Sequence, residues 1–296
     1  MKFFKKLNRY AAMATGDFQK IFKDFEVPAC PKVVTELLNA TKDPDVTIDK
    51  VANILEMDPG LGSKLLRMVN SSLYGLPNTV SSIVRAVNLV GLKEIENLAV
   101  CYAITKGLKD PKVKGFDLDR FIQTSFFRAI IAREVASFFS AEREEAFTGG
   151  LMQDIAIPTL LTDWFDIYGP VFEEHLKSGR PLHELETERF SWNHCEAGAW
   201  IAREWEFPDV LVCAIGLHAR EFDELKEMEV ERSAIGAVAL SARAPDPMDK
   251  LEDDPSHLEL YLEYGTKAGL DEITLKETFD RSKTILEELS SIFNGQ

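Results

Sequence analysis

Three side chains in the central part of the chain, Asp154, His194 and His218, are of types that hold metal ions or transfer protons. Imidazole nitrogens and carboxylate oxygens are ligands for divalent transition metals, and an open position on such a metal activates water. Each residue also has a structural interpretation. His194 precedes a predicted helix, His218 lies near a helix C-terminus where a cation is favoured, and Asp154 can cap a helix end. For His218 we favour the structural role.

The four cysteines offer less chemistry. Cys195 follows His194 directly, but neighbouring residues on a helix point about 100° apart, so we discount a nucleophile and base formed by that pair. Cys30, Cys101, Cys195 and Cys213 lie far apart, and no two have the short spacing of a zinc or redox motif. We expect all four to be small buried apolar side chains, and we expect no bound metal or cofactor.

The elements that would position these residues are helices. Ile48, Val51, Ala52 and Leu55 form one apolar stripe, with Thr47 as its N-cap. The next helix is predicted to begin near Pro59. Another runs from about residue 81 and ends at Gly91. Similar periodicity predicts further helices at 93–108, 119–139, 144–153, 170–178, 195–206, 208–219, 232–243 and 271–293. Strand alternation is nearly absent, so the sequence predicts an all-α fold.

Composition narrows the class of protein. The chain carries 34 basic and 49 acidic residues, a net charge of −15, which repels a phosphate backbone and disfavours nucleic-acid binding. No apolar run approaches the roughly 20 residues of a membrane span. The basic start lacks a signal-peptide core, so we expect a cytoplasmic protein.

The first 19 residues form a predicted basic amphipathic helix, with Phe3, Phe4 and Leu7 on its apolar face. Such a helix could lie on an anionic membrane, but we favour packing on the rest of the protein. A Pro- and Asp-rich stretch at 244–255 separates the bulk of the chain from a terminal helical piece.

An ordered series of motifs is similar to the HDOD domain. The series consists of Val27–Val33, Asp58–Arg67, Val69–Gly75, Val80–Ile83, Ala86–Leu92, Glu145–Asp154, Trp192–Gly198, Trp205–Pro208 and Ala214–His218. The resemblance spans about residues 20–222. It implies a helical subdomain at about 20–110, an HD-like bundle at about 115–222, and a C-terminal helical extension at 223–296.

The resemblance also implies what the central residues once did. HDOD domains resemble the HD metal-dependent phosphohydrolases, whose bundle holds one or two metals between helices. Where those enzymes have a first His we align Thr124, and where they have the His of the His-Asp pair this chain has Gln153 before Asp154. The closing Asp, expected near 240–243, is absent. Thr124, Gln153, Asp154, His194 and His218 therefore form a vestigial site, because hydroxyl and amide groups are poor substitutes for imidazole.

A second region could recognise a partner. Asn70, Ser71 and Tyr74 lie in a helix-ending turn, where polar and aromatic side chains suit either binding or structure. We leave both roles open.

These observations favour a non-catalytic bacterial signal-transduction module that acts by binding other signalling proteins. Two alternatives remain. One is a metal-dependent phosphohydrolase or cyclic-nucleotide phosphodiesterase with an altered metal site. The other is a sensor that binds a nucleotide or metabolite in the old pocket. A homo-oligomer is compatible with each of them.

Overall fold

The computed structural model describes residues 18, 32–43, 45–244 and 255–293. These residues form helices joined by turns and loops, and none of them lies in a strand. The predicted all-α fold class is therefore confirmed. Within the same ranges, no helix combines the length and the apolar composition needed to cross a membrane. The predicted helix at 1–19 lies outside the described residues except for Phe18, whose ring meets the edge of Trp192.

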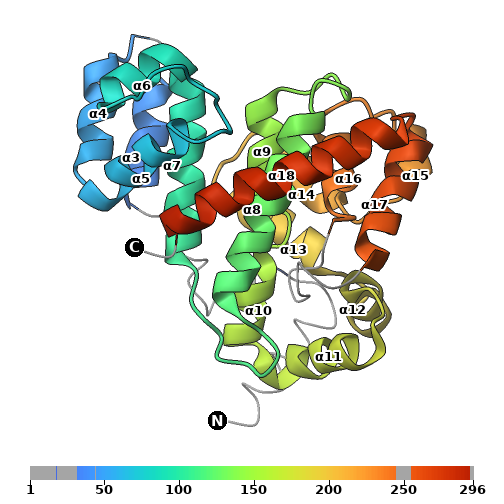
Figure 1. The fold of residues 1–296 in the computed structure, drawn as a ribbon. Coiled ribbons are helices and arrows are strands. Elements are labelled where there is room, and N and C mark those ends of the chain that lie inside the picture. The colour runs from blue at the N-terminus through green and yellow to red at the C-terminus, as the bar shows by residue number, and fades with distance from the viewer. Residues whose placement is uncertain (1–17, 19–31, 44, 245–254, 294–296) are drawn as a thin grey trace, which may run out of the picture.

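The first helices of the described chain form one group, seen at the upper left of Figure 1. They are α3 (Lys32–Thr41), α4 (Ile48–Glu56), α5 (Pro59–Val69), α6 (Ile83–Val90) and α7 (Leu92–Gly107). Their boundaries follow the predicted caps: the Thr47 side chain accepts a hydrogen bond from the backbone N–H of Lys50, and Pro59 opens α5. Gly91 ends α6 with a φ of 95°, a conformation that favours glycine.

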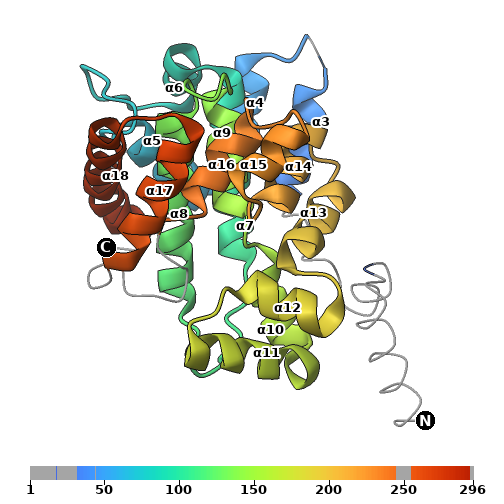
Figure 2. The ribbon, with the colours of Figure 1, turned by 90° about the vertical axis from the view of Figure 1, so that its right-hand side faces the viewer.

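The long helix α8 (Leu118–Val135) begins the second group, the bundle that contains the central histidines. The other members are α9 (Arg143–Met152), α10 (Ala156–Asp163), α11 (Phe165–Ser178), α12 (Leu182–Phe190), α13 (His194–Glu204), α14 (Asp209–Leu217), α15 (Phe222–Glu227) and α16 (Ala234–Ser241). Figure 2 shows α10, α11 and α12 together at one end, with α13 and α14 above them.

The two last helices, α17 (Pro255–Ala268) and α18 (Glu272–Phe293), pack on this bundle. Helix α18 crosses α8 and reaches the first group of helices, as Figure 1 shows. There the Glu288 carboxylate accepts a hydrogen bond from the backbone N–H of Ser72 at 2.8 Å. The C-terminal extension therefore bridges the two groups. The division of the chain into domains near residues 19 and 222 stays a prediction.

Some predicted elements need correction. Helix α11 begins at Phe165 and contains Pro170, whereas the apolar periodicity of the sequence predicted a helix over 170–178. Helices α3, α10 and α12 had no predicted counterpart. Among the cysteines, Cys101 and Cys195 are buried as expected, but Cys213 is exposed, which contradicts the prediction. Cys30 lies outside the described residues.

Candidate functional site

The turn between α9 and α10 carries Asp154 into the centre of the bundle, where its carboxyl group meets three cationic or titratable groups. Its Oδ2 accepts a hydrogen bond from Arg128 Nη1 on α8 at 2.5 Å. Its Oδ1 lies 3.2 Å from His194 Nε2 and 3.4 Å from His218 Nε2. All four side chains are buried. Asp154 is therefore the centre of a polar cluster and not a helix cap on the surface.

His194 occupies the first position of α13, and the local sequence explains why. Asn193 is the N-cap and forms a capping box with Glu196, which fixes the start of the helix. Gly198, one turn later, lets α13 approach α14, because a Cβ there would come within 2.9 Å of Ile215. The His194 imidazole then points back to the Asp154 turn.

Glu186 on α12 orients His194. Its Oε2 accepts hydrogen bonds from His194 Nδ1 at 2.6 Å and from the His194 backbone N–H at 2.9 Å. The Tyr168 hydroxyl donates to its other oxygen. Glu186 is fully buried and was not predicted from the sequence. The spacing of apolar residues could have indicated it, since Glu186 falls on the buried face of its helix with Leu182, Leu185 and Phe190.

His218 ends α14, as the sequence predicted, and its Nδ1 donates to the carbonyl of Ile215 at 2.7 Å. Its Nε2 lies 3.7 Å from the sulfur of Cys195. Arg243, directly after α16, donates to the carbonyls of His218, Ala219 and Arg220, which places a cation at the carboxyl end of α14.

The cluster is strongly coupled electrostatically. Burial alone would raise the pKa of Asp154, but the Arg128 guanidinium and the two imidazoles hold it well below its usual range. Burial would lower the pKa of His218, but Cys195 and Asp154 raise it to about 9. Burial would raise the pKa of Cys195, and the two imidazoles lower it to about 6. Opposite charges therefore stabilise one another in a region without solvent.

Thr124 and Gln153 do not join this network. Thr124 Oγ1 and Gln153 Oε1 are buried and have no hydrogen-bond partner among the described residues. The Gln153 amide donates to the Gly150 carbonyl at 3.1 Å. The hydrolytic HD set does not fit these residues, because Thr124 and Gln153 stand where the resemblance implies imidazoles and one oxygen of Asp154 is taken by Arg128. A smaller donor set remains, since one ligand atom each from His194, Cys195 and His218 lie within 4.8 Å of one another.

The predicted recognition residues mostly contact their own subdomain. The Asn70 amide donates to the carbonyls of Leu66 and Val80 and accepts from the Val80 backbone N–H. Ser71 donates to the Met68 carbonyl at 2.6 Å. The Tyr74 hydroxyl donates to Glu94, and Arg133 lies over the Tyr74 ring. These contacts account for the residue types structurally, and a recognition role for them stays a prediction.

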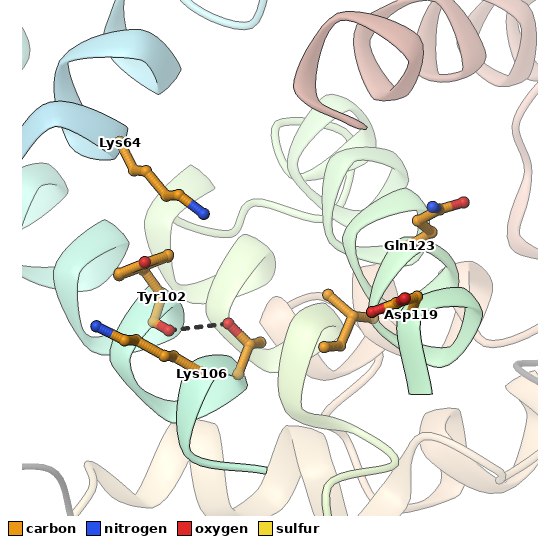
Figure 3. A pocket seen from close by; sticks show the side chains of 7 residues that line it. Lys64, Tyr102, Lys106, Asp119 and Gln123 are labelled. Atoms are coloured by element: carbon orange, nitrogen blue, oxygen red, sulfur yellow. Dashed lines mark hydrogen bonds between the residues drawn. The ribbon is translucent and has the colours of Figure 1, made fainter. Parts of the chain in front are cut away.

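A pocket of about 140 Å³ lies where the first group of helices meets α8. Lys64 and Lys106 lie 5.3 and 5.9 Å from the centre of the Tyr102 ring, and Asp119 and Gln123 face them from α8 (Figure 3). Sequence patterns did not single out these residues. Two lysines beside an aromatic ring suit an anionic group.

Comparisons with known proteins agree with this architecture. The model of the HDOD domain family matches residues 27–221, and the chain belongs to that family. A crystal structure of a candidate phosphohydrolase from Shewanella amazonensis is similar at a TM-score of 0.74 and 24% identity, covering 95% of this chain and 99% of that one. An HDOD domain protein of unknown function from Geobacter sulfurreducens has a TM-score of 0.68 and 22% identity, covering 93% and 96%. Identities this low show the fold alone.

An uncharacterized protein of Treponema pallidum is 22% identical over 88% of this chain. The chain spans about half the length of that curated relative, which it covers to 51%. A candidate signal transduction protein from Marinobacter aquaeolei also shares the fold, with a TM-score of 0.66 and 18% identity over 93% of this chain and 61% of that one.

Proposed function

We propose that this chain is a non-catalytic signal-transduction module that acts by binding other signalling proteins. The ion pair between Arg128 and Asp154 carries the proposal. In a metal-dependent hydrolase this carboxylate would hold the ion that activates water. Here one of its oxygens is taken by a buried guanidinium, and a guanidinium cannot activate water as a metal does. Thr124 and Gln153, which replace imidazoles, support the same conclusion.

The surface for such binding is the junction between the first group of helices and α8. The pocket there is smaller than the roughly 300–1,000 Å³ of typical small-molecule sites, which favours one side chain of a partner over a whole nucleotide. Because Lys64 and Lys106 line it, we infer that the matching group is a carboxylate on a partner protein, which would compete with Asp58 for Lys106 and would have Asp119 as a neighbour. A sensor of small molecules is the weaker alternative at this position.

Whether the protein hydrolyses phosphate esters is tested by measuring turnover. The purified protein, loaded in turn with Mn²⁺, Fe²⁺ and Zn²⁺, is assayed on phosphomonoesters and cyclic dinucleotides, with Asp154→Ala as the matched variant. We expect no hydrolysis above that of Asp154→Ala. Metal-dependent turnover that disappears in Asp154→Ala would establish a phosphohydrolase and overturn the proposal.

The binding surface is tested by charge reversal. A folded, tagged protein is cross-linked in its native cell, and recovered signalling proteins are identified by mass spectrometry. We expect a signalling partner whose recovery falls on Lys64→Glu and Lys106→Glu together, and persists with Lys50→Glu, an exposed lysine on α4 outside the pocket. Recovery of no signalling protein, or equal recovery with all variants, would contradict binding at this surface.

A further inference from the structure

Three side chains with transition-metal donors converge at the junction of α13 and α14. They are His194 and Cys195, the first two residues of α13, and His218, which follows α14. One ligand atom from each lies within 4.8 Å of the others, and all three residues are buried. Although His194 and Cys195 are successive residues, the Cys195 sulfur lies 3.7 Å from His218 Nε2, and the Nε2 atoms of both histidines lie near Asp154 Oδ1.

The Nδ1 atoms of both histidines already form hydrogen bonds within the protein. His194 Nδ1 donates to the Glu186 carboxylate and His218 Nδ1 donates to the Ile215 carbonyl, and neither acceptor can itself donate. Each neutral imidazole therefore carries its lone pair on Nε2. Metal-binding histidines in proteins are held in this way, with the second nitrogen bonded to a carboxylate or a backbone carbonyl.

Both Nε2 atoms face the same carboxylate oxygen. Asp154 Oδ1 lies 3.2 Å from one and 3.4 Å from the other. Two lone pairs and a carboxylate oxygen repel one another at such distances unless positive charge lies among them. That charge is either a proton on each ring or a single cation bound by all of them.

We propose that His194, Cys195 and His218 bind one Zn²⁺-like divalent ion through Nε2, Sγ and Nε2, and that Asp154 Oδ1 closes the fourth side. Tetrahedral zinc with bonds of about 2.0–2.1 Å to nitrogen and about 2.3 Å to sulfur places such donors about 3.3–3.7 Å apart. The Cys195–His218 separation of 3.7 Å and the His218–Asp154 Oδ1 contact of 3.4 Å are in that range, and the His194–Asp154 Oδ1 contact of 3.2 Å lies just below it.

Charge balance permits a metal of this charge, and protons on both imidazoles would balance the same anions equally. A Cys195 thiolate, Asp154 and Glu186 carry three negative charges, and Arg128 supplies one positive charge. A divalent ion makes this buried group neutral. The same donors disfavour Mg²⁺ and Ca²⁺, which prefer oxygen ligands.

The site differs from the hydrolytic centre that the sequence resemblance implies. It uses a thiolate, needs neither Thr124 nor Gln153, and leaves no open position for water once Asp154 closes it. Closed sites of this kind are structural. The ion would fasten α13 and α14 to the turn at Asp154. The sequence led us to expect no metal, so this inference departs from that expectation and is independent of the proposed function.

Cobalt gives the most direct test. The full chain is stripped with a chelator, dialysed, and titrated with Co²⁺ and with Zn²⁺. We expect one ion per chain and a near-ultraviolet sulfur-to-cobalt charge-transfer band that Zn²⁺ abolishes. Cys195→Ser removes the band and weakens binding by at least about 10- to 100-fold, and Cys213→Ala, an exposed cysteine on α14, changes neither.

Wild-type protein alone can overturn the proposal, whether or not the variants fold. A folded wild-type chain that retains no Zn²⁺ or Co²⁺ after dialysis would show that protons fill the cluster. Bound Co²⁺ without the sulfur band would exclude Cys195 as a ligand. A band that persists in Cys195→Ser would place the metal elsewhere.

Discussion

Arg128 determines the character of the central cluster because it is the permanent cation next to Asp154. Both side chains are about one-twentieth exposed, so neither charge has water as a substitute partner. Breaking a buried ion pair by removing one member costs more than the pair itself contributes, since the remaining charge stays buried.

Replacing Arg128 by Met should therefore destabilise the protein by about 3–5 kcal/mol. The free energy of unfolding is measured by urea titration. Arg85→Met, at an exposed position on α6, is the control and should change stability by no more than about 0.5 kcal/mol. Asp154→Asn combined with Arg128→Met should cost less than the sum of the two single changes. Strict additivity would contradict the coupling.

The sequence predicted part of this cluster. Asp154, His194 and His218 meet in the structure, as their residue types suggested. Glu186 and Arg128 were missed because charged side chains are usually exposed, so their residue types did not indicate core positions. The convergence of Cys195 with the histidines could not be predicted, since it depends on how α13 meets α14 in space.

Helix packing sets the distance between α8 and α9, and Gly150 on α9 makes it small. A Cβ on Gly150 would come within 2.9 Å of the Cα of Ala129 and 3.1 Å of the Arg128 carbonyl oxygen. A Cβ on Gly149 would come within 2.9 Å of the Val238 side chain on α16. Because backbone atoms cannot move aside as a flexible side chain can, this contact also fixes where Arg128 stands relative to Asp154.

Gly150→Ala should therefore destabilise the protein by about 1–3 kcal/mol through overpacking. Gly62→Ala on α5 is the matched control. A Cβ there has only an ordinary contact, 3.8 Å from the Leu55 carbonyl oxygen, so better helix propensity should stabilise the protein by about 0.5–1 kcal/mol. Thermal or urea unfolding of both variants measures the two effects. Equal changes of the same sign would show that close packing at Gly150 is unimportant.

Helices with a clear apolar stripe and a recognisable cap were predicted well, as α4, α5 and α6 show. Helix α10 was missed because Ala156 to Leu161 are all buried, so it has no polar face to reveal the period. Helix α12 was missed because Glu186 interrupts its apolar stripe. In both cases tertiary burial, not local preference, explains why the helix forms.

At the scale of the whole molecule, a buried network joins the first group of helices to the bundle. Glu94 on α7 pairs with Arg133 on α8 at 2.9 Å and accepts a hydrogen bond from Tyr74. Helix α18 adds a second connection. Its Glu288 binds Ser72 of the first group, and its Arg281 pairs with Glu134 on α8 of the bundle. The resemblance to HDOD domains implied two subdomains, but these connections join residues far apart in the chain and carry no local signal.

Glu94 should make the stability of the whole molecule depend on pH in a defined direction. Burial raises the pKa of its carboxyl above the usual 4.5, although Arg133 and Tyr74 oppose the shift. The folded protein therefore holds this proton more tightly than the unfolded chain. The contribution of Glu94 to stability is fully present below about pH 4.5 and is lost as the pH rises through the folded pKa.

The free energy of unfolding of wild type minus that of Glu94→Gln should thus be largest at the lowest pH and decrease toward neutrality, because the other titrating groups cancel in the difference. Each tenfold tightening of proton binding on folding contributes about 1.4 kcal/mol to that decrease. Urea titrations followed by tryptophan fluorescence at low concentration measure it, since the pI of about 4.9 limits solubility in this range. The exposed Glu56→Gln on α4 is the control. A difference that grew with pH would mean that Arg133, and not burial, determines the direction of the pKa shift at Glu94. In that case the ionised pair of Glu94 and Arg133 would hold the two groups of helices together.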